Sequence, residues 1–225
     1  MKKIVSFVCA ALCCVAMNAQ LVTSRSVSVS TVSAPKTPSR TTWMVRLGLA
    51  TNNVVSEELD DISAKIGYTF GFEFNRSIGR RGAYWGMDFT LASRGCDVDK
   101  YFEDCKFKLH SIQWAPYTFG WKIDLGHDLR LDPHIGVFVA GDIAGKFTDG
   151  DEDIKIGDFD ELEEIFDATF NRYDIGIKTG VGLWYKKFNI DFTYQRGFVP
   201  VFDFSDADDY NVYQSNFWIR AAYAF

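Results

Sequence analysis

The fold is decided by the last fourteen residues of the chain, Val212-Tyr-Gln-Ser-Asn-Phe-Trp-Ile-Arg-Ala-Ala-Tyr-Ala-Phe225. Phe217, Tyr223 and the terminal Phe225 share one parity, whereas polar side chains such as Arg220 take the other. A period of two is that of an extended strand with one apolar and one polar face. Because the apolar face is aromatic, the stretch predicts a strand of a transmembrane β-barrel, with those three aromatic residues as its terminal signature on the lipid side.

Seven earlier segments show the same alternation. They are residues 43–50, 66–75, 83–94, 107–124, 129–141, 172–185 and 187–196. The connections between them are alternately long and short, which is the pattern of external loops and periplasmic turns in outer-membrane barrels. In lipid an open sheet edge would leave backbone amides unpaired, so the sheet must close. The sequence therefore predicts an all-β fold, an eight-stranded antiparallel transmembrane up-and-down β-barrel.

A soluble β-sandwich would also alternate. Two features favour the barrel. The apolar face is large and rich in Phe, Tyr and Trp, and the opposite face carries full charges. The apolar run from Ile4 to Met17 is too short for a transmembrane helix, and no other apolar run in the chain is long enough.

The amino-terminal segment predicts export. Two lysines precede an apolar run from Ile4 to Met17, and a small residue, Ala19, offers a cleavage point. We expect residues 1–19 to be a signal peptide, residues 20–41 a flexible periplasmic leader, and residues 42–225 the barrel domain. Removing the signal takes away two lysines and no acid, so the formal net charge falls from −6 to −8. No basic stripe remains, which excludes a nucleic-acid partner.

Cysteine usage agrees with an oxidising compartment. Three of the five cysteines leave with the signal, and the remaining pair is Cys96 and Cys105. Two nearby cysteines in an exported protein favour a disulfide, with two free thiols as the alternative. A metal site is disfavoured because no histidine cluster accompanies the pair.

The strands resemble those of a small porin-like family of outer-membrane barrels known as PorT-like proteins. The resemblance is carried by residues 172–182 (RYDIGIKTGVG), 188–197 (FNIDFTYQRG) and 217–225 (FWIRAAYAF). It extends over about residues 43–225 and implies an outer-membrane location and an eight-stranded barrel. One founding member is linked to protein secretion, but strand patterns alone do not transfer that role.

Charged side chains follow the lumen-facing parity of the predicted strands. They are Arg46, Glu73, Asp88, Lys122, Asp124, Arg130, Asp132, His134, Asp174, Lys178, Asp191 and Arg220. An eight-stranded barrel is just wide enough for side chains to fill it, so we expect these charges to pair across a narrow interior. Glycines on the same parity would make room for larger neighbours. The network either plugs and stiffens the barrel or forms a path for protons or small ions.

The loop at 142–171 is the main functional candidate outside the lumen. Residues 149–167 contain ten acidic residues and one base. Asp149, Asp151 and Asp153 alternate as in a calcium loop, but the glycine and the final glutamate of an EF-hand are missing. The spacing leaves two alternatives, a weak cation site or a solvated, repulsive loop.

No catalytic set emerges from the three histidines, His110, His127 and His134, because none converges with a nucleophile and an acid. We therefore expect a non-enzymatic, cofactor-free, monomeric barrel in contact with outer-membrane lipid. Its filled or very narrow lumen predicts a structural or interaction role through acidic loops that meet an extracellular or envelope partner. The alternatives are a small porin-like channel and an accessory part of a secretion system.

Overall fold

The computed structural model describes residues 41–55, 63–78, 82–97, 106–149, 152–155, 168–204 and 212–225. The chain divides into two units, residues 1–38 and 39–225, and the described residues belong to the second. The expected signal peptide and nearly all of the expected leader lie outside the described residues.

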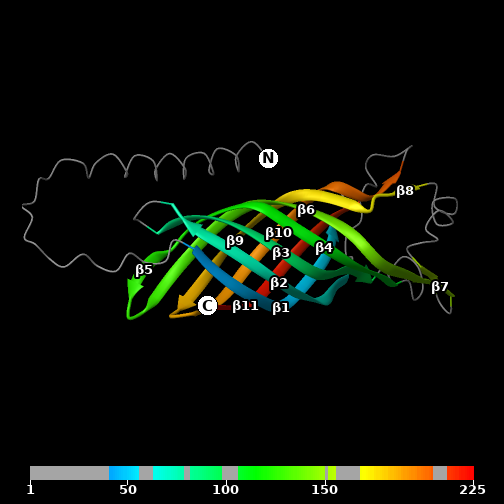
Figure 1. Ribbon diagram of the computed structural model, residues 1–225. Helices are drawn as coiled ribbons and strands as arrows, with labels where there is room; N and C mark the ends of the chain where they lie inside the picture. Colours follow the sequence, from blue (N-terminus) through cyan, green and yellow to red (C-terminus); the bar gives the residue numbers. More distant parts are fainter. Residues whose placement is uncertain are drawn as a thin grey trace, which may run out of the picture. The chain divides into compact units, whose positions relative to one another are not determined.

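Eight long strands form a closed antiparallel barrel (Figure 1). They are β1 (Thr41–Val55), β2 (Ser63–Ser77), β3 (Ala83–Asp97), β4 (Lys106–Trp121), β6 (Leu129–Asp149), β9 (Tyr173–Tyr185), β10 (Phe188–Phe204) and β11 (Val212–Ala224). Each pairs with the next, and β11 pairs with β1 through a register that sets Gly48 opposite Arg220. The predicted eight-stranded up-and-down barrel is confirmed.

Three short strands extend the barrel at its two ends. β5 (Ile123–Gly126) continues the line of β4 along β6, after a break at Lys122. β7 (Glu152–Lys155) pairs with the far end of β6, and β8 (Ala168–Phe170) pairs with the far end of β10. On the side of the long loops, strand pairing therefore extends further than the alternation of apolar and polar residues predicted.

The outer wall of the barrel is apolar. Large side chains on the outward parity leave about half of their surface free, as for Phe72 at 52%, Phe119 at 52% and Ile190 at 51%. Neighbouring rings pack edge to face, as Trp43 and Phe74 do with centroids 4.8 Å apart. The interior is polar. Apolar side chains therefore face outward and polar ones inward, the reverse of a soluble domain, as expected where lipid surrounds the protein.

No helix among the described residues is long and apolar enough to cross a membrane.

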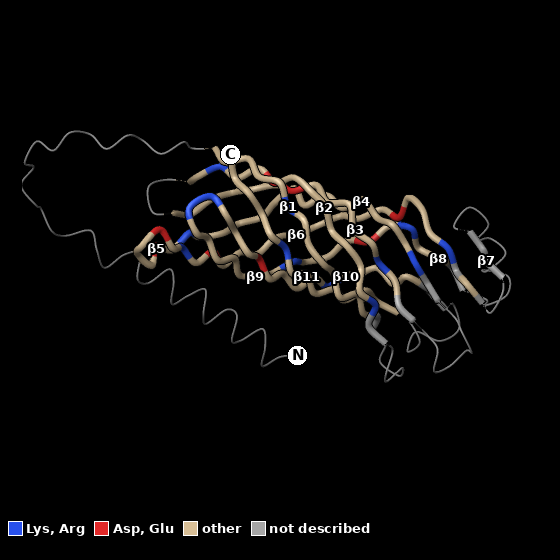
Figure 2. Tube along the Cα trace, turned by 90° about the horizontal axis from the view of Figure 1, so that it is seen from below, with Lys and Arg blue, Asp and Glu red and all other residues tan. Residues whose placement is uncertain are grey.

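Two tight turns mark one end of the barrel. His127 and Asp128 have φ of 54° and 64°, as a type I′ hairpin turn requires. Lys186, in the turn between β9 and β10, has φ of 54°. Figure 2 shows blue segments gathered at this end, beside β5. Because short turns face the periplasm in outer-membrane barrels, we call it the periplasmic end.

Candidate functional site

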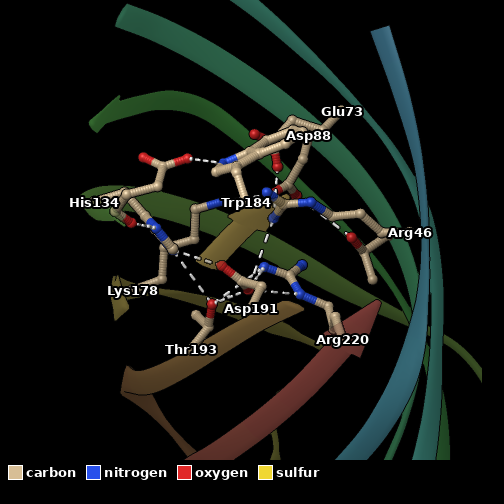
Figure 3. A network of polar contacts seen from close by, with 11 residues as sticks. Arg46, Glu73, Asp88, His134, Lys178, Trp184, Asp191, Thr193 and Arg220 are labelled. Carbon is tan, nitrogen blue, oxygen red and sulfur yellow. Dashed lines mark hydrogen bonds and ion pairs between the residues drawn. The ribbon is translucent and has the colours of Figure 1, made fainter. Parts of the chain in front are cut away.

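The centre of the lumen is organised around Asp191 on β10 (Figure 3). Its Oδ1 accepts hydrogen bonds from Arg220 Nη2 at 2.8 Å and from Arg220 Nε at 3.2 Å. The Thr193 hydroxyl donates to the same oxygen at 2.6 Å, and Arg46 Nη1 lies 3.8 Å away. One carboxylate thus holds two guanidinium groups that come from β1 and β11, the strands that close the barrel.

Two further ion pairs surround this centre. Arg46 Nη1 lies 2.6 Å from Glu73 Oε2. The Lys178 ammonium pairs with the Asp88 carboxylate from the other side of the lumen. All four side chains are buried. The pairs join β1 to β2 and β9 to β3, so the second one bridges strands that are not neighbours in the sheet.

A histidine and a tryptophan complete the central network. His134 Nε2 lies 3.3 Å from Thr193 Oγ1 and 3.5 Å from Asp191 Oδ2. Trp184 Nε1 donates to Asp132 Oδ2 at 2.7 Å. Both acids are buried, and each has a donor from a different strand. Burying a carboxylate without such partners would cost several kcal/mol.

Aromatic rings and cations fill the periplasmic end of the lumen. Lys122 Nζ lies 4.5 Å from the centroid of the Trp184 ring and 5.1 Å from that of Tyr84. The guanidinium carbon of Arg130 is 5.9 Å from the Trp184 ring. Trp184 and Tyr84 are buried. Cation–π contacts therefore cover the charged centre from this side.

The loop end of the lumen holds a second cluster. Arg94 Nη1 lies 3.5 Å from Asp174 Oδ2, and its guanidinium carbon is 5.9 Å from the Phe138 ring. Nearby, the Ser111 hydroxyl donates to Asp142. Arg94 and Asp142 were missed by sequence reasoning. Arg94 shares the parity of Asp88, and Asp142 shares that of Asp132 and His134. Extending the alternation could have found both, because the irregularity in β6 begins only after Asp142.

Glycines give these large side chains their space. A Cβ on Gly48 would lie 2.1 Å from the Ile219 carbonyl oxygen and 2.9 Å from Arg220 Cγ. On Gly176 it would lie 2.7 Å from the Phe138 ring, and on Gly180 it would lie 2.7 Å from His134 Nε2. The expectation that glycines make room for larger neighbours in the lumen agrees with these distances.

The buried charges nearly balance. Among the described residues, four firm bases (Arg46, Arg94, Lys178, Arg220) and five acids (Glu73, Asp88, Asp132, Asp174, Asp191) are buried together with His134. Every acid in this set has a charged or hydrogen-bonding partner. Bonds between charged groups are stronger in a low-dielectric interior, so the network holds the strands together across the lumen.

Three predicted lumen residues lie elsewhere or at its edge. Lys122 and Arg130 are partly exposed at the periplasmic end. Asp124 is exposed on β5, beyond the end of β4, opposite Arg130. Its Oδ1 accepts a hydrogen bond from the Gly126 amide at 2.8 Å within the turn.

Other candidate residues lie outside the described part of the chain, wholly or by their side chains. Cys96 lies on β3, but its side chain and all of Cys105 are not described, so the disulfide stays a prediction. The same holds for the candidate cation site at Asp149, Asp151 and Asp153. Within the described residues, no group of three or more His, Cys, Asp or Glu could hold a metal ion.

The terminal signature points outward. Phe217, Tyr223 and Phe225 are all exposed on the outer wall. The Phe225 amide donates to the Trp43 carbonyl at 3.1 Å, so the chain end is paired with β1.

The histidines have the following partners. His110 Nδ1 lies 3.0 Å from the Tyr68 hydroxyl, and His127 lies exposed in a turn. His134 lies beside Thr193, but the Thr193 hydroxyl donates its hydrogen to Asp191 and both side chains are buried. An activated nucleophile needs a base that accepts its proton and access to substrate, and this pair provides neither.

Comparison with known proteins identifies the fold family. The family model described as outer membrane protein beta-barrel domain matches residues 18–203. The chain belongs to this family. It is an outer-membrane protein, as the sequence predicted. A search of curated protein sequences finds no match. The narrower resemblance to PorT-like proteins stays a prediction.

Several solved structures are similar to the chain. Neisserial surface protein A is 15% identical with a TM-score of 0.48, over 81% of this chain and 97% of that chain. A major outer membrane protein from Thermus thermophilus is 14% identical with a TM-score of 0.47, over 82% and 99%. Ail, the attachment invasion locus protein of Yersinia pestis, in complex with the heparin analogue sucrose octasulfate, is 16% identical with a TM-score of 0.41, over 83% and 99%.

Proposed function

We propose that the protein is a non-conducting outer-membrane barrel that presents acidic loops to an extracellular or envelope partner. The observation that carries this proposal is the buried network across the lumen. Arg46 and Arg220 meet on Asp191, and Lys178 reaches across to Asp88. A solute that entered would have to separate these pairs, and removing one partner of a buried pair costs about 3–5 kcal/mol.

The composition of the loops supports the second half of the proposal. Residues 149–167, which include β7, carry ten acids against one base, and residues 197–211, which include the end of β10, carry four acids and no base. Like charges at this density repel one another and attract a cationic surface, which increases the rate of encounter with a basic partner. A barrel with a closed lumen serves here as a stable anchor for such loops.

Conductance in planar bilayers tests the first half. The refolded protein should give no stable steps above the background of the bilayer, whereas a general porin measured alongside should give large ones. Large, stable steps from the wild-type protein would contradict the proposal and favour the porin-like channel.

Crosslinking in intact cells tests the second half. One variant carries a tag within residues 156–167, and a matched variant carries the same tag with Asp158, Asp160, Glu161, Glu163 and Glu164 changed to Asn or Gln. The tagged wild-type loop should capture an envelope or extracellular protein that the neutralised loop does not. Equal capture by both would contradict a charge-based contact. Capture of secretion-machinery components would support the accessory role in secretion.

A further inference from the structure

The turn between β9 and β10 holds a lysine in a backbone conformation that lysine disfavours. Lys186 has φ of 54°, whereas Lys187 is not among the residues with positive φ. A two-residue hairpin turn with positive φ at its first central position is of the II′ kind, in which glycine is preferred. A lysine at this position therefore carries a backbone cost that glycine would avoid.

The turn is held firmly in place. The Lys186 amide donates to the Asp128 carbonyl at 3.2 Å, and Arg130 Nη2 donates to the Lys186 carbonyl at 3.0 Å. The Ala224 amide donates to the Lys187 carbonyl at 2.9 Å. These bonds connect the turn to the neighbouring turn and to β11. Both lysines therefore extend from a fixed backbone.

Both ammonium groups lie beside outward tyrosines. Lys186 Nζ is 5.3 Å from the centroid of the Tyr185 ring, and Lys187 Nζ is 5.9 Å from that of Tyr223. The Phe188 ring packs on Tyr223 with centroids 5.2 Å apart. All three rings are exposed on the outer wall. Neither lysine forms an ion pair with a carboxylate of the described residues.

We propose that this surface binds the phosphate of an anionic phospholipid in the periplasmic leaflet. We call it the lysine–tyrosine rim; it consists of Tyr185, Lys186, Lys187, Phe188 and Tyr223. The ammonium groups meet the phosphate, and the rings border the glycerol backbone and the upper acyl chains. Lipid is the occupant because the rim is continuous with the apolar outer wall. This inference is independent of the loops and the lumen.

Quenching of tryptophan fluorescence by brominated lipids tests the proposal. The refolded protein is placed in bilayers that mix phosphatidylcholine with phosphatidylglycerol, with the bromine on either lipid. The wild-type protein should prefer phosphatidylglycerol by about threefold to tenfold, as expected for two lysines near a charged headgroup. The double variant Lys186→Gln, Lys187→Gln should lower the preference to about one. The matched control Lys108→Gln, an exposed lysine at the loop end, should retain it.

The single variant Lys186→Gly separates binding from folding. Glycine suits the positive φ, so the urea midpoint should rise while the preference for phosphatidylglycerol falls. A double glutamine variant with the wild-type preference would overturn the proposal, as would an equal loss in Lys108→Gln. Inorganic phosphate, compared with chloride at equal ionic strength, should leave the lipid preference unchanged. If the preference for phosphatidylglycerol disappeared in phosphate buffer, the site would bind the free ion, and the assignment to lipid would be overturned.

Discussion

At the scale of single residues, Asp191 determines the electrostatics of the lumen. It is 1% exposed and lies against Arg220, Arg46 and His134. This carboxylate is the ion-pair partner of Arg220 among the described residues, and it adds to the pairing of Arg46 with Glu73. The cost of removing it greatly exceeds that of removing a surface acid, because the stranded cations cannot recover their hydration.

The variant Asp191→Asn is expected to destabilise the barrel by about 3–5 kcal/mol, since it leaves Arg220 and Arg46 without their shared charge. Urea unfolding in detergent or lipid vesicles, followed by tryptophan fluorescence, measures this loss. Asp128→Asn is the control, because Asp128 is exposed in a turn and asparagine accepts its positive φ. Equal urea unfolding midpoints for the two variants would argue against a stabilising role of the buried charge network.

A second prediction concerns space in the lumen. Gly180→Ala should destabilise the barrel by about 1–3 kcal/mol, because the new Cβ would lie 2.5 Å from the Phe192 carbonyl oxygen and 2.7 Å from His134 Nε2. Gly141→Ala should be nearly neutral, because its Cβ would meet only the Tyr173 ring at 3.6 Å. Heat-dependent gel mobility and urea unfolding midpoints measure the stability of both variants. An undisturbed Gly180→Ala barrel would count against a filled lumen.

At the scale of elements, the strands were predictable and their ends were not. The alternation between apolar and polar residues finds the membrane-spanning parts because lipid and lumen impose opposite polarity on successive residues. Beyond the membrane both faces meet water, so the signal disappears where β6 continues past Gly141 and where the acidic β7 pairs with it. Register irregularities in the β4–β6 ladder, around Ser111 and between Trp114 and Tyr117, also break the period.

For the candidate site, the sequence predicted which side chains face the lumen but not which of them pair. Parity places Arg46, Asp191 and Arg220 on the lumen side, but it cannot state which of them pair, because that depends on strand register across the closed sheet. For Trp184, residue type and parity point in opposite directions. Its aromatic ring is typical of the lipid-facing residues, but its parity places it in the lumen, where its indole N–H donates to Asp132.

The turn between β5 and β6 offers a test at this scale. His127 and Asp128 both adopt positive φ. Replacing them with Asn-Gly, the preferred pair for a type I′ turn, should stabilise the barrel by about 0.5–1 kcal/mol without altering the lumen. Urea midpoints measure the gain, and the bilayer conductance should stay at background. A lower midpoint would mean that the side chains of this turn contribute contacts of their own.

For the whole molecule, the outward wall requires an apolar environment. Phe70, Phe119 and Ile190 are each about half exposed, and similar residues cover the described strands. The protein, transferred from detergent into plain buffer, should aggregate, whereas an amphipathic polymer should keep it monodisperse. Size-exclusion chromatography distinguishes the two results. A stable monomer in plain buffer would contradict the membrane assignment.

The pairing of the last strand with the first also sets the timing of biogenesis. The bond from Phe225 to Trp43 and the contact between Arg46 and Asp191 join β1 to β11 and β10, which are far apart in the sequence. Neither can form until β10 and β11 have been made and exported, so the polypeptide crosses the periplasm without its closing contacts and with its apolar wall uncovered. An uncovered apolar wall is prone to aggregation during transit, and the pairing of β1 with β11 both closes the wall and brings Arg46 to Asp191.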